Sequence, residues 1–104
     1  LDWSLPARRI HDKIRAFHPA PGCWTELVDD SGNAVRVKIW RTHSASPVVE
    51  ALETSGTLRA LPGGRVAVAC GEGALELVEV QAEGKPRRSG RDWFNGLHGN
   101  PSFR

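Results

Sequence analysis

Hydrophobic residues recur every three to four positions near the start of the chain, which is the spacing of one helical face. The residues on this face are Ala7, Ile10, Ile14 and Phe17. Ser4 has a residue type favoured at a helix N-cap, and Pro6 fits the first turn, where its missing N–H needs no partner. The pattern predicts a helix of about three turns, ended by the proline-rich stretch 18–22.

The next stretch alternates hydrophobic and polar residues, as strands do. Residues 23–28 predict one strand, residues 29–33 a hairpin turn, and residues 35–41 a second strand. Successive side chains of a strand point to opposite faces, so the second strand is expected to bury Val35, Val37 and Ile39. Its other face carries Arg36, Lys38 and Trp40. The same pattern also fits an ordinary amphipathic strand with solvated cations.

The rest of the chain predicts short strands between tight turns. Residues 43–55 are polar and mixed, which predicts an irregular excursion with a helical turn at 48–52. Strands are expected at 56–61, 65–70 and 74–81, and Leu77-Val78 breaks the alternation of the last, which indicates a bulge or burial of both faces. A basic loop at 82–88 leads to a short helix through Asn95, with Ser89 as its cap and Gly96 at its end.

This order of elements predicts a mainly β fold. We expect a small, partly open antiparallel barrel of about five strands, similar to an oligonucleotide-binding (OB) fold, with an N-terminal helix and a short C-terminal helix. An open sheet is the alternative.

Length and composition argue against a membrane-spanning protein, a secreted protein and a zinc site. A chain of 104 residues is one domain, and no apolar run approaches the ~20 residues of a membrane span. There is no secretory signal pattern, so we expect a cytoplasmic protein in which Cys23 and Cys70 are reduced and buried. The four histidines lack the short paired spacings of zinc sites. Because the chain has no methionine and begins at Leu1, we expect it to be a piece of a longer protein.

Charge is distributed unevenly along the chain. Residues 1–41 carry seven Lys/Arg against five Asp/Glu, residues 42–84 two against six, and residues 85–104 five against one. If the termini lie close together, one face is expected to be positive. The candidate nucleic-acid-binding residues, which would contact phosphates with little preference for sequence, are Arg36, Lys38, Trp40, Lys85, Arg87, Arg88 and Arg91. No nucleophile–base pair can be placed, so no catalytic residue is predicted.

Several motifs in order resemble the C-terminal domain of the methionyl-tRNA formyltransferase family. They are Asp2-Trp3-Ser4, residues 14–24 (IRAFHPAPGCW), Val37-Lys38-Ile39-Trp40, residues 69–77 (ACGEGALEL), Val80-Gln81, Gly84-Lys85, and residues 92–96 (DWFNG). The match runs from end to end, although residues 97–104 depart from the basic tail common in that family.

The resemblance implies that catalysis and tRNA binding belong to two different domains. Residues 1–4 would be the remnant of an interdomain linker and residues 5–104 the OB-like domain, joined in cis to an absent Rossmann-like N-terminal domain. That absent domain would hold the catalytic residues and the 10-formyltetrahydrofolate, so this chain would be no enzyme on its own and would hold no cofactor or metal. The domain present here would bind initiator tRNA through its phosphates and present it for formyl transfer.

The same module occurs in other folate-dependent formyltransferases, including those that act on nucleotide sugars. In such a protein the domain would be a structural or interaction module without nucleic-acid binding. This is the alternative function that the sequence leaves open.

Overall fold

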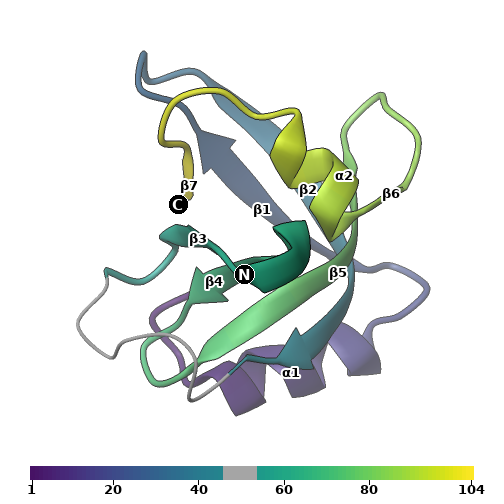
Figure 1. Ribbon diagram of the computed structural model, residues 1–104. Helices are drawn as coiled ribbons and strands as arrows, with labels where there is room; N and C mark the ends of the chain where they lie inside the picture. The colour runs from purple at the N-terminus through teal and green to yellow at the C-terminus, as the bar shows by residue number, and fades with distance from the viewer. Residues whose placement is uncertain (46–53) are drawn as a thin grey trace.

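The computed structural model describes residues 1–45 and 54–104. Its strands form one antiparallel sheet that curls into a nearly closed barrel (Figure 1), with the order β3-β4-β5-β2-β1-β7 and β6 paired to β5. The elements are α1 (Ala7–Ala16), β1 (Cys23–Val28), β2 (Ala34–Ser44), β3 (Leu58–Ala60), the 3₁₀ turn η1 (Pro62–Gly64), β4 (Val66–Ala69), β5 (Ala74–Ala82), β6 (Arg88–Ser89), α2 (Gly90–Asn95) and β7 (Ser102–Phe103). The predicted mainly β barrel with two flanking helices is confirmed, with two additional two-residue strands.

The C-terminal segment closes the barrel, which the sequence did not predict. β7 pairs with β1 through Leu27 and Val28, and a bridge joins Ser102 to Thr57 just before β3. The backbone N–H of Phe103 also donates to the carbonyl of Gly56 at 2.9 Å. Gly56 has a φ of +92°, and a Cβ there would collide with the carbonyl oxygen of Phe103, so this approach requires glycine.

Stacked aromatic rings fill the core beneath that closure. The ring of Phe103 stacks on Trp3 at 5.1 Å between centroids and on Trp93 at 5.9 Å. All three residues are buried. The indole N–H of Trp3 donates to Thr25 Oγ1 at 2.8 Å, which satisfies its buried polar atom. The first residues of the chain, its last residues and α2 are therefore held by one packed cluster.

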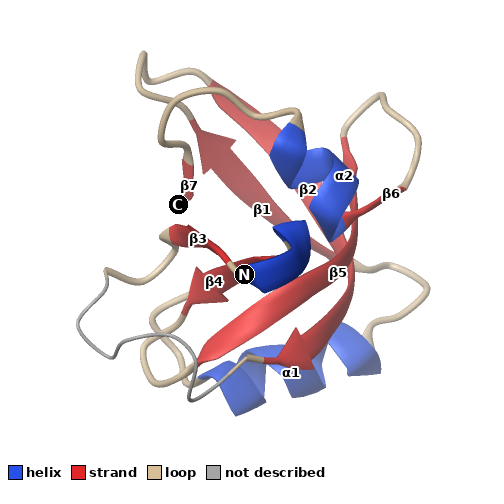
Figure 2. Ribbon diagram, in the orientation of Figure 1, coloured by secondary structure: helices blue, strands red, loops and turns tan. Residues whose placement is uncertain are grey.

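The two helices lie at opposite ends of the barrel (Figure 2). α1 packs Ile10 and Ile14 against β2 and β5. α2 packs on β5 so closely that a Cβ on Gly90 would collide with the carbonyl oxygen of Leu77. Its predicted cap is confirmed, because Ser89 Oγ accepts the N–H of Asp92 at 3.1 Å.

Three local predictions from the sequence are wrong. Phe17 is 41% exposed because α1 ends at Ala16, so the helical spacing no longer controls where the Phe17 side chain points. Val35 is 47% exposed because the pairing of β2 with β5 begins only at Val37, which leaves the hairpin tip beyond the barrel. Ser4 does not cap α1: Pro6 is the N-cap residue, and Ser4 Oγ bonds Asp2 Oδ1 instead. The helical turn predicted at 48–52 lies outside the described residues.

The predicted irregularity at Leu77-Val78 is confirmed. Arg41 lies opposite Glu79 and Thr42 opposite Leu77, so Val78 is an extra residue on β5. One step earlier, Ile39 lies opposite Val80 and Arg41 opposite Glu79, so Trp40 is an extra residue on β2. The extra residue at Trp40 changes the alternation of β2. Val37 and Ile39 are buried, so strict alternation would bury Arg41 next, but Thr42 is buried instead.

Both chain ends lie beside β1. The terminal ammonium of Leu1 donates to the carbonyl of Trp24, and the backbone N–H of Arg104 donates to the carbonyl of Glu26, each at 2.9 Å. The two termini therefore lie close together, which is the condition under which the sequence predicts one positive face. In the part of the chain that the structure describes, neither helix has the length and apolarity needed to cross a bilayer.

Both cysteines are free and buried, as predicted from their strand-like surroundings. The Cys70 thiol is 6% exposed and lies 3.7 Å from the carbonyl of Val68. Burial raises the pKa of Cys70 to about 11, because a thiolate would lose its hydration there.

The aromatic stack predicts a strong stability effect of Phe103. The substitution Phe103→Ala should lower the free energy of unfolding by about 3 to 5 kcal/mol, because it removes a buried ring from between two indoles. The matched control is Phe17→Ala, where an exposed ring should cost less than about 1 kcal/mol. Urea unfolding measures both, and equal losses would contradict the assigned role of Phe103.

Cys70 predicts a loss of stability in alkali. The pKa of the thiol is raised in the folded state. The contribution of the protonated thiol to the free energy of unfolding is therefore fully present below about pH 9 and is lost as the pH rises toward about 11. The unfolding free energy should therefore fall more steeply between these values in the parent chain than in Cys70→Ala. Parallel pH profiles of the two proteins would refute this.

Candidate nucleic-acid interface

Three neighbouring strands bring one set of side chains to the outside of the barrel. β2 lies between β1 and β5, and Lys38 is opposite Trp24 on one side and Gln81 on the other. Directly opposed residues share a face of the sheet, so these three side chains form a row across it. Val37 and Ile39, one position away on each side of Lys38, are buried in the core.

Cations and aromatic rings alternate on this outer surface. We name it the cationic face and define it by Trp24, Arg36, Lys38, Trp40 and Arg87. The guanidinium carbon of Arg36 lies 4.5 Å from the centroid of the Trp24 ring. Lys38 Nζ lies 6.0 Å from the centroid of Trp24 and 3.9 Å from that of Trp40, and the guanidinium carbon of Arg87 lies 3.8 Å from Trp40. These distances are those of cation–π contacts, which hold the charged groups in place on the surface.

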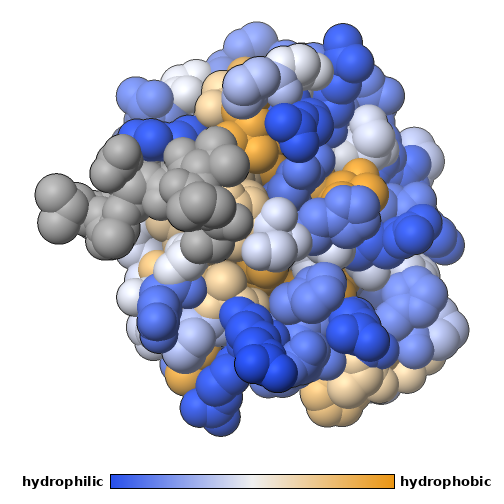
Figure 3. All heavy atoms as spheres, turned by 60° about the horizontal axis from the view of Figure 1, so that its bottom comes forward, coloured by the Kyte–Doolittle hydropathy of each residue, from blue (hydrophilic) through white to orange (hydrophobic). Residues whose placement is uncertain are grey.

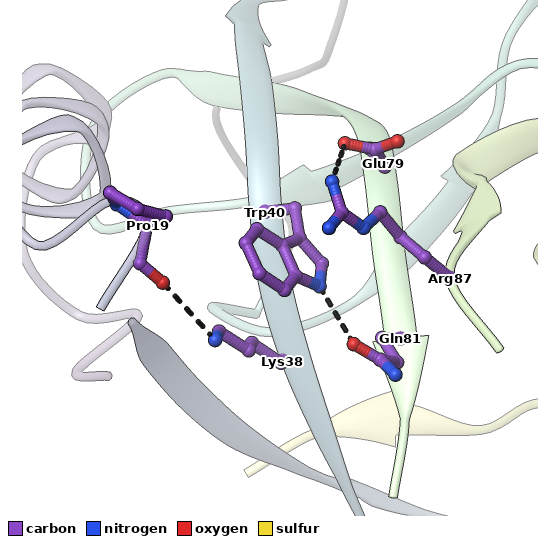
Figure 4. Close-up of polar contacts among 6 residues, drawn as sticks. All are labelled: Pro19, Lys38, Trp40, Glu79, Gln81 and Arg87. Atoms are coloured by element: carbon purple, nitrogen blue, oxygen red, sulfur yellow. Dashed lines mark hydrogen bonds and ion pairs between the residues drawn. The ribbon is translucent and has the colours of Figure 1, made fainter. Parts of the chain in front are cut away.

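Trp40 is the most constrained member of the cationic face. Its indole N–H donates to Gln81 Oε1 at 3.0 Å, and the amide of Gln81 donates to the carbonyl of Lys85 at 2.9 Å. Gln81 thus ties the ring to the 83–87 loop that carries Arg87. Figure 4 shows Lys38 and Arg87 approaching the indole from different sides. The edge of His18 contacts the ring as well, at 5.5 Å between centroids.

The cations of this face have polar partners near the surface, and the side chain of Glu83 is 58% exposed whereas that of Glu79 is 30% exposed. Arg36 pairs with Glu83 at 3.3 Å, Arg87 pairs with Glu79 at 3.5 Å, and Lys38 Nζ donates to the carbonyl of Pro19 at 3.3 Å. The side chains of Arg36 and Glu83 are both more than half exposed. Ion pairs in such positions contribute little to stability because water and salt screen them. A phosphate can therefore replace these carboxylates at small cost to the fold.

Comparison with known proteins shows the family of the chain. Residues 1–98 match the family described as "Formyl transferase, C-terminal domain". The chain belongs to this formyl transferase C-terminal domain family.

Individual relatives carry a more specific name. The chain is 40% identical over 104 residues to a methionyl-tRNA formyltransferase of Methylobacterium sp., covering 100% of this chain and 31% of the relative. It is 38% identical over 97 residues to the methionyl-tRNA formyltransferase of Bradyrhizobium diazoefficiens, covering 93% of this chain and 29% of the relative. The corresponding protein of Protochlamydia amoebophila is 36% identical over 100 residues, with coverages of 96% and 30%. The chain thus spans about a third of the length of these relatives.

The remaining candidate residues lie elsewhere on the formyl transferase C-terminal domain. Lys85 and Arg88 line a different hollow beside α2, together with Trp93 and Leu97. Arg91, on α2, lies against Gly64 of η1. The sequence therefore grouped seven residues that the fold separates: Arg36, Lys38, Trp40 and Arg87 come together, whereas Lys85, Arg88 and Arg91 do not join them.

Sequence reasoning missed two members of the arrangement. The sequence pattern places Trp24 in the predicted strand 23–28 and Gln81 at the end of the predicted strand 74–81, with no functional role for either. The hairpin turn at 29–33 already sets the register that places Trp24 opposite Lys38, so Trp24 could have been found by counting back from the turn. Gln81 had no such signal, because its position depends on the bulges between β2 and β5.

Metal-ligating clusters and exposed thiols are absent from the described part of the formyl transferase C-terminal domain. Among the residues that the structure describes, no group of three or more His, Cys, Asp and Glu side chains gathers as a metal site would require. Both thiols are buried, and burial raises the pKa of each, which favours the unreactive protonated form. The arrangement supports binding of an anionic, extended partner.

The exposed fractions of three arginine–carboxylate ion pairs predict how much each arginine contributes to stability. Arg36→Gln and Arg87→Gln should each lower the unfolding free energy by about 1 kcal/mol or less, since each removes exposed contacts. Arg65→Gln is the comparison, because Arg65 bonds Glu76 at 2.9 Å and the Glu76 side chain is only 15% exposed. That variant should cost about 1.5 to 3 kcal/mol. The ranking is wrong if urea unfolding shows equal losses for the three variants.

Proposed function

We propose that the chain is the noncatalytic, tRNA-binding C-terminal domain of a methionyl-tRNA formyltransferase, and that the cationic face contacts tRNA phosphates. The observation that carries the proposal is the gathering of Arg36, Lys38 and Arg87 around two indoles on three adjacent strands. The names of the relatives support the choice of tRNA as the nucleic acid.

The electrostatics of the face favour phosphates without reading sequence. Two of its cations are paired with carboxylates that a polyanion can displace: the Glu83 side chain is more than half exposed and the Glu79 side chain is partly exposed. Binding then releases counterions from the RNA, so that affinity falls steeply as salt rises. Nothing in this arrangement distinguishes one base from another, so discrimination of the initiator tRNA is assigned to other parts of the enzyme.

The proposal leaves formyl transfer to the rest of the enzyme. The relatives are about three times as long as this chain. We place the catalytic residues and the 10-formyltetrahydrofolate in a Rossmann-like domain joined in cis, with this domain presenting initiator tRNA to it in the cytoplasm. Trp3 is packed in the core and Leu1 bonds β1, so a segment preceding Leu1 would enter beside Trp24 of the cationic face.

Direct binding measurements test the function. The 104-residue chain should bind tRNA at low salt, and each phosphate contact should add about 0.7 to 0.9 to the slope of log affinity against log salt. The double substitution Arg36→Glu with Lys38→Glu should weaken binding by at least about tenfold and lower that slope by roughly two. Fluorescence anisotropy with labelled tRNA over a salt series gives both quantities.

The matched control reverses two charges away from the cationic face. Arg88→Glu with Arg91→Glu makes the same change in net charge beside α2. If it weakens binding as much as the Arg36/Lys38 double variant, net charge drives binding and the face has no special role. If the parent chain retains no tRNA even at low salt, the domain is a structural module of another formyltransferase. Circular dichroism of each variant checks that the fold is intact.

A further inference from the structure

A hollow lies between α1 and β2, at the edge of the cationic face. Its volume is about 370 Å³, within the range of small-ligand pockets. The lining residues that matter are His11, Arg15, His18, Trp40, Arg41 and His43. Trp40 belongs both to this hollow and to the cationic face, so the two are continuous. In Figure 3 the side of the molecule that carries α1 is mostly hydrophilic, with small separate hydrophobic patches.

The hollow is positively charged through Arg15 and Arg41, and no carboxylate lines it among the residues that the structure describes. Arg41 forms no ion pair with any residue that the structure describes. Glu79, opposite Arg41 on β5, bonds Arg87, and Glu76, opposite His43, bonds Arg65. Arg15 has a loose contact with Asp12 at 3.8 Å, with both side chains exposed. The two β5 carboxylates opposite the hollow are thus engaged with arginines outside it, and Asp12 forms only an exposed pair with Arg15.

The walls of the hollow are planar rings held in fixed positions. His11 Nδ1 lies 2.6 Å from the buried Thr42 Oγ1, which orients the imidazole from α1. The rings of His18 and Trp40 meet nearly edge to face, with 77° between their planes. Trp40 is further held by Gln81. Aromatic and imidazole rings beside arginines are the means by which proteins hold unstacked bases together with their phosphates.

We propose that this hollow is a subsite for one unpaired nucleotide of the bound RNA, with the phosphate at Arg15 and Arg41 and the base against the imidazoles and Trp40. The inference rests on the proposed function, because it requires RNA on the adjacent cationic face. A nucleotide in a duplex is stacked and paired, so its base cannot enter a hollow of this size between a helix and a strand. The subsite therefore selects an unpaired position in the tRNA rather than a sequence.

The test compares two RNAs on the 104-residue chain. One is a labelled single strand of about six nucleotides, and the other is the duplex of the same sequence. The pocket variant, Arg15→Gln with Arg41→Gln, should weaken binding of the single strand by about tenfold and change duplex binding by less than about twofold. The matched control, Arg8→Gln with Arg9→Gln, removes the same net charge from α1 outside the hollow and should change neither.

Each outcome separates the subsite from the proposed function. Single-strand binding unchanged in the pocket variant, or duplex binding weakened equally, overturns the subsite. If this happens while Arg36→Glu with Lys38→Glu still weakens duplex binding, the proposed function stands without it. If neither RNA binds the parent chain at low salt, both proposals fail.

Two further readouts distinguish a base subsite from a simple anion site. The imidazole C–H signals of His43, which lines the hollow and is not part of the cationic face, should shift when the single strand is added and not when the duplex is added. They are assigned in NMR spectra by comparison with His43→Gln. Inorganic pyrophosphate should compete poorly with the single strand, because it lacks a base. Competition at similar concentrations would show an anion site alone and would overturn the nucleotide subsite.

Discussion

The stack of Phe103 between Trp3 and Trp93 is the contact on which the rest of the structure depends. It joins the first residues, the last residues and α2 across a core that seven strands enclose, three of which (β3, β6 and β7) have only two or three residues. Strands of two or three residues hold few hydrogen bonds of their own, so packing under the closure has to keep them together. The close approach of Gly56 to the Phe103 carbonyl shows how little space that closure leaves.

The same closure shapes the outside of the barrel. β1 is held on one edge by β7 and on the other by β2, which fixes Trp24 under Arg36 and opposite Lys38. Two compensating bulges, at Trp40 on β2 and at Val78 on β5, then shift the register so that Arg41 is exposed while Thr42 turns into the interior. The hollow beside the cationic face depends on this local irregularity, because it turns Arg41 outward next to Trp40.

The energetics of the two sides of the sheet differ. The inner side is stabilised by burial of aliphatic and aromatic groups, which salt scarcely affects. The outer side holds cations on aromatic rings and pairs them with carboxylates that are at least partly exposed, and these interactions weaken as salt rises. A partner with closely spaced phosphates can therefore exchange for the carboxylates while the barrel stays unchanged. The ion pairs of the binding surface can therefore be exchanged without any change in the packing of the core.

The sequence by itself determined the class of fold, the order of the main elements, the α2 cap at Ser89 and the irregularity at Leu77-Val78. Each of these follows from local periodicity or from turn and capping chemistry over a few neighbouring residues. Only the tertiary structure decided that β7 closes the barrel, that Phe17 and Val35 are exposed, and that Lys85, Arg88 and Arg91 lie apart from Arg36 and Lys38. The physical reason is that these outcomes depend on where strands end and which distant strand lies beside them, and local side-chain patterns do not encode those distances.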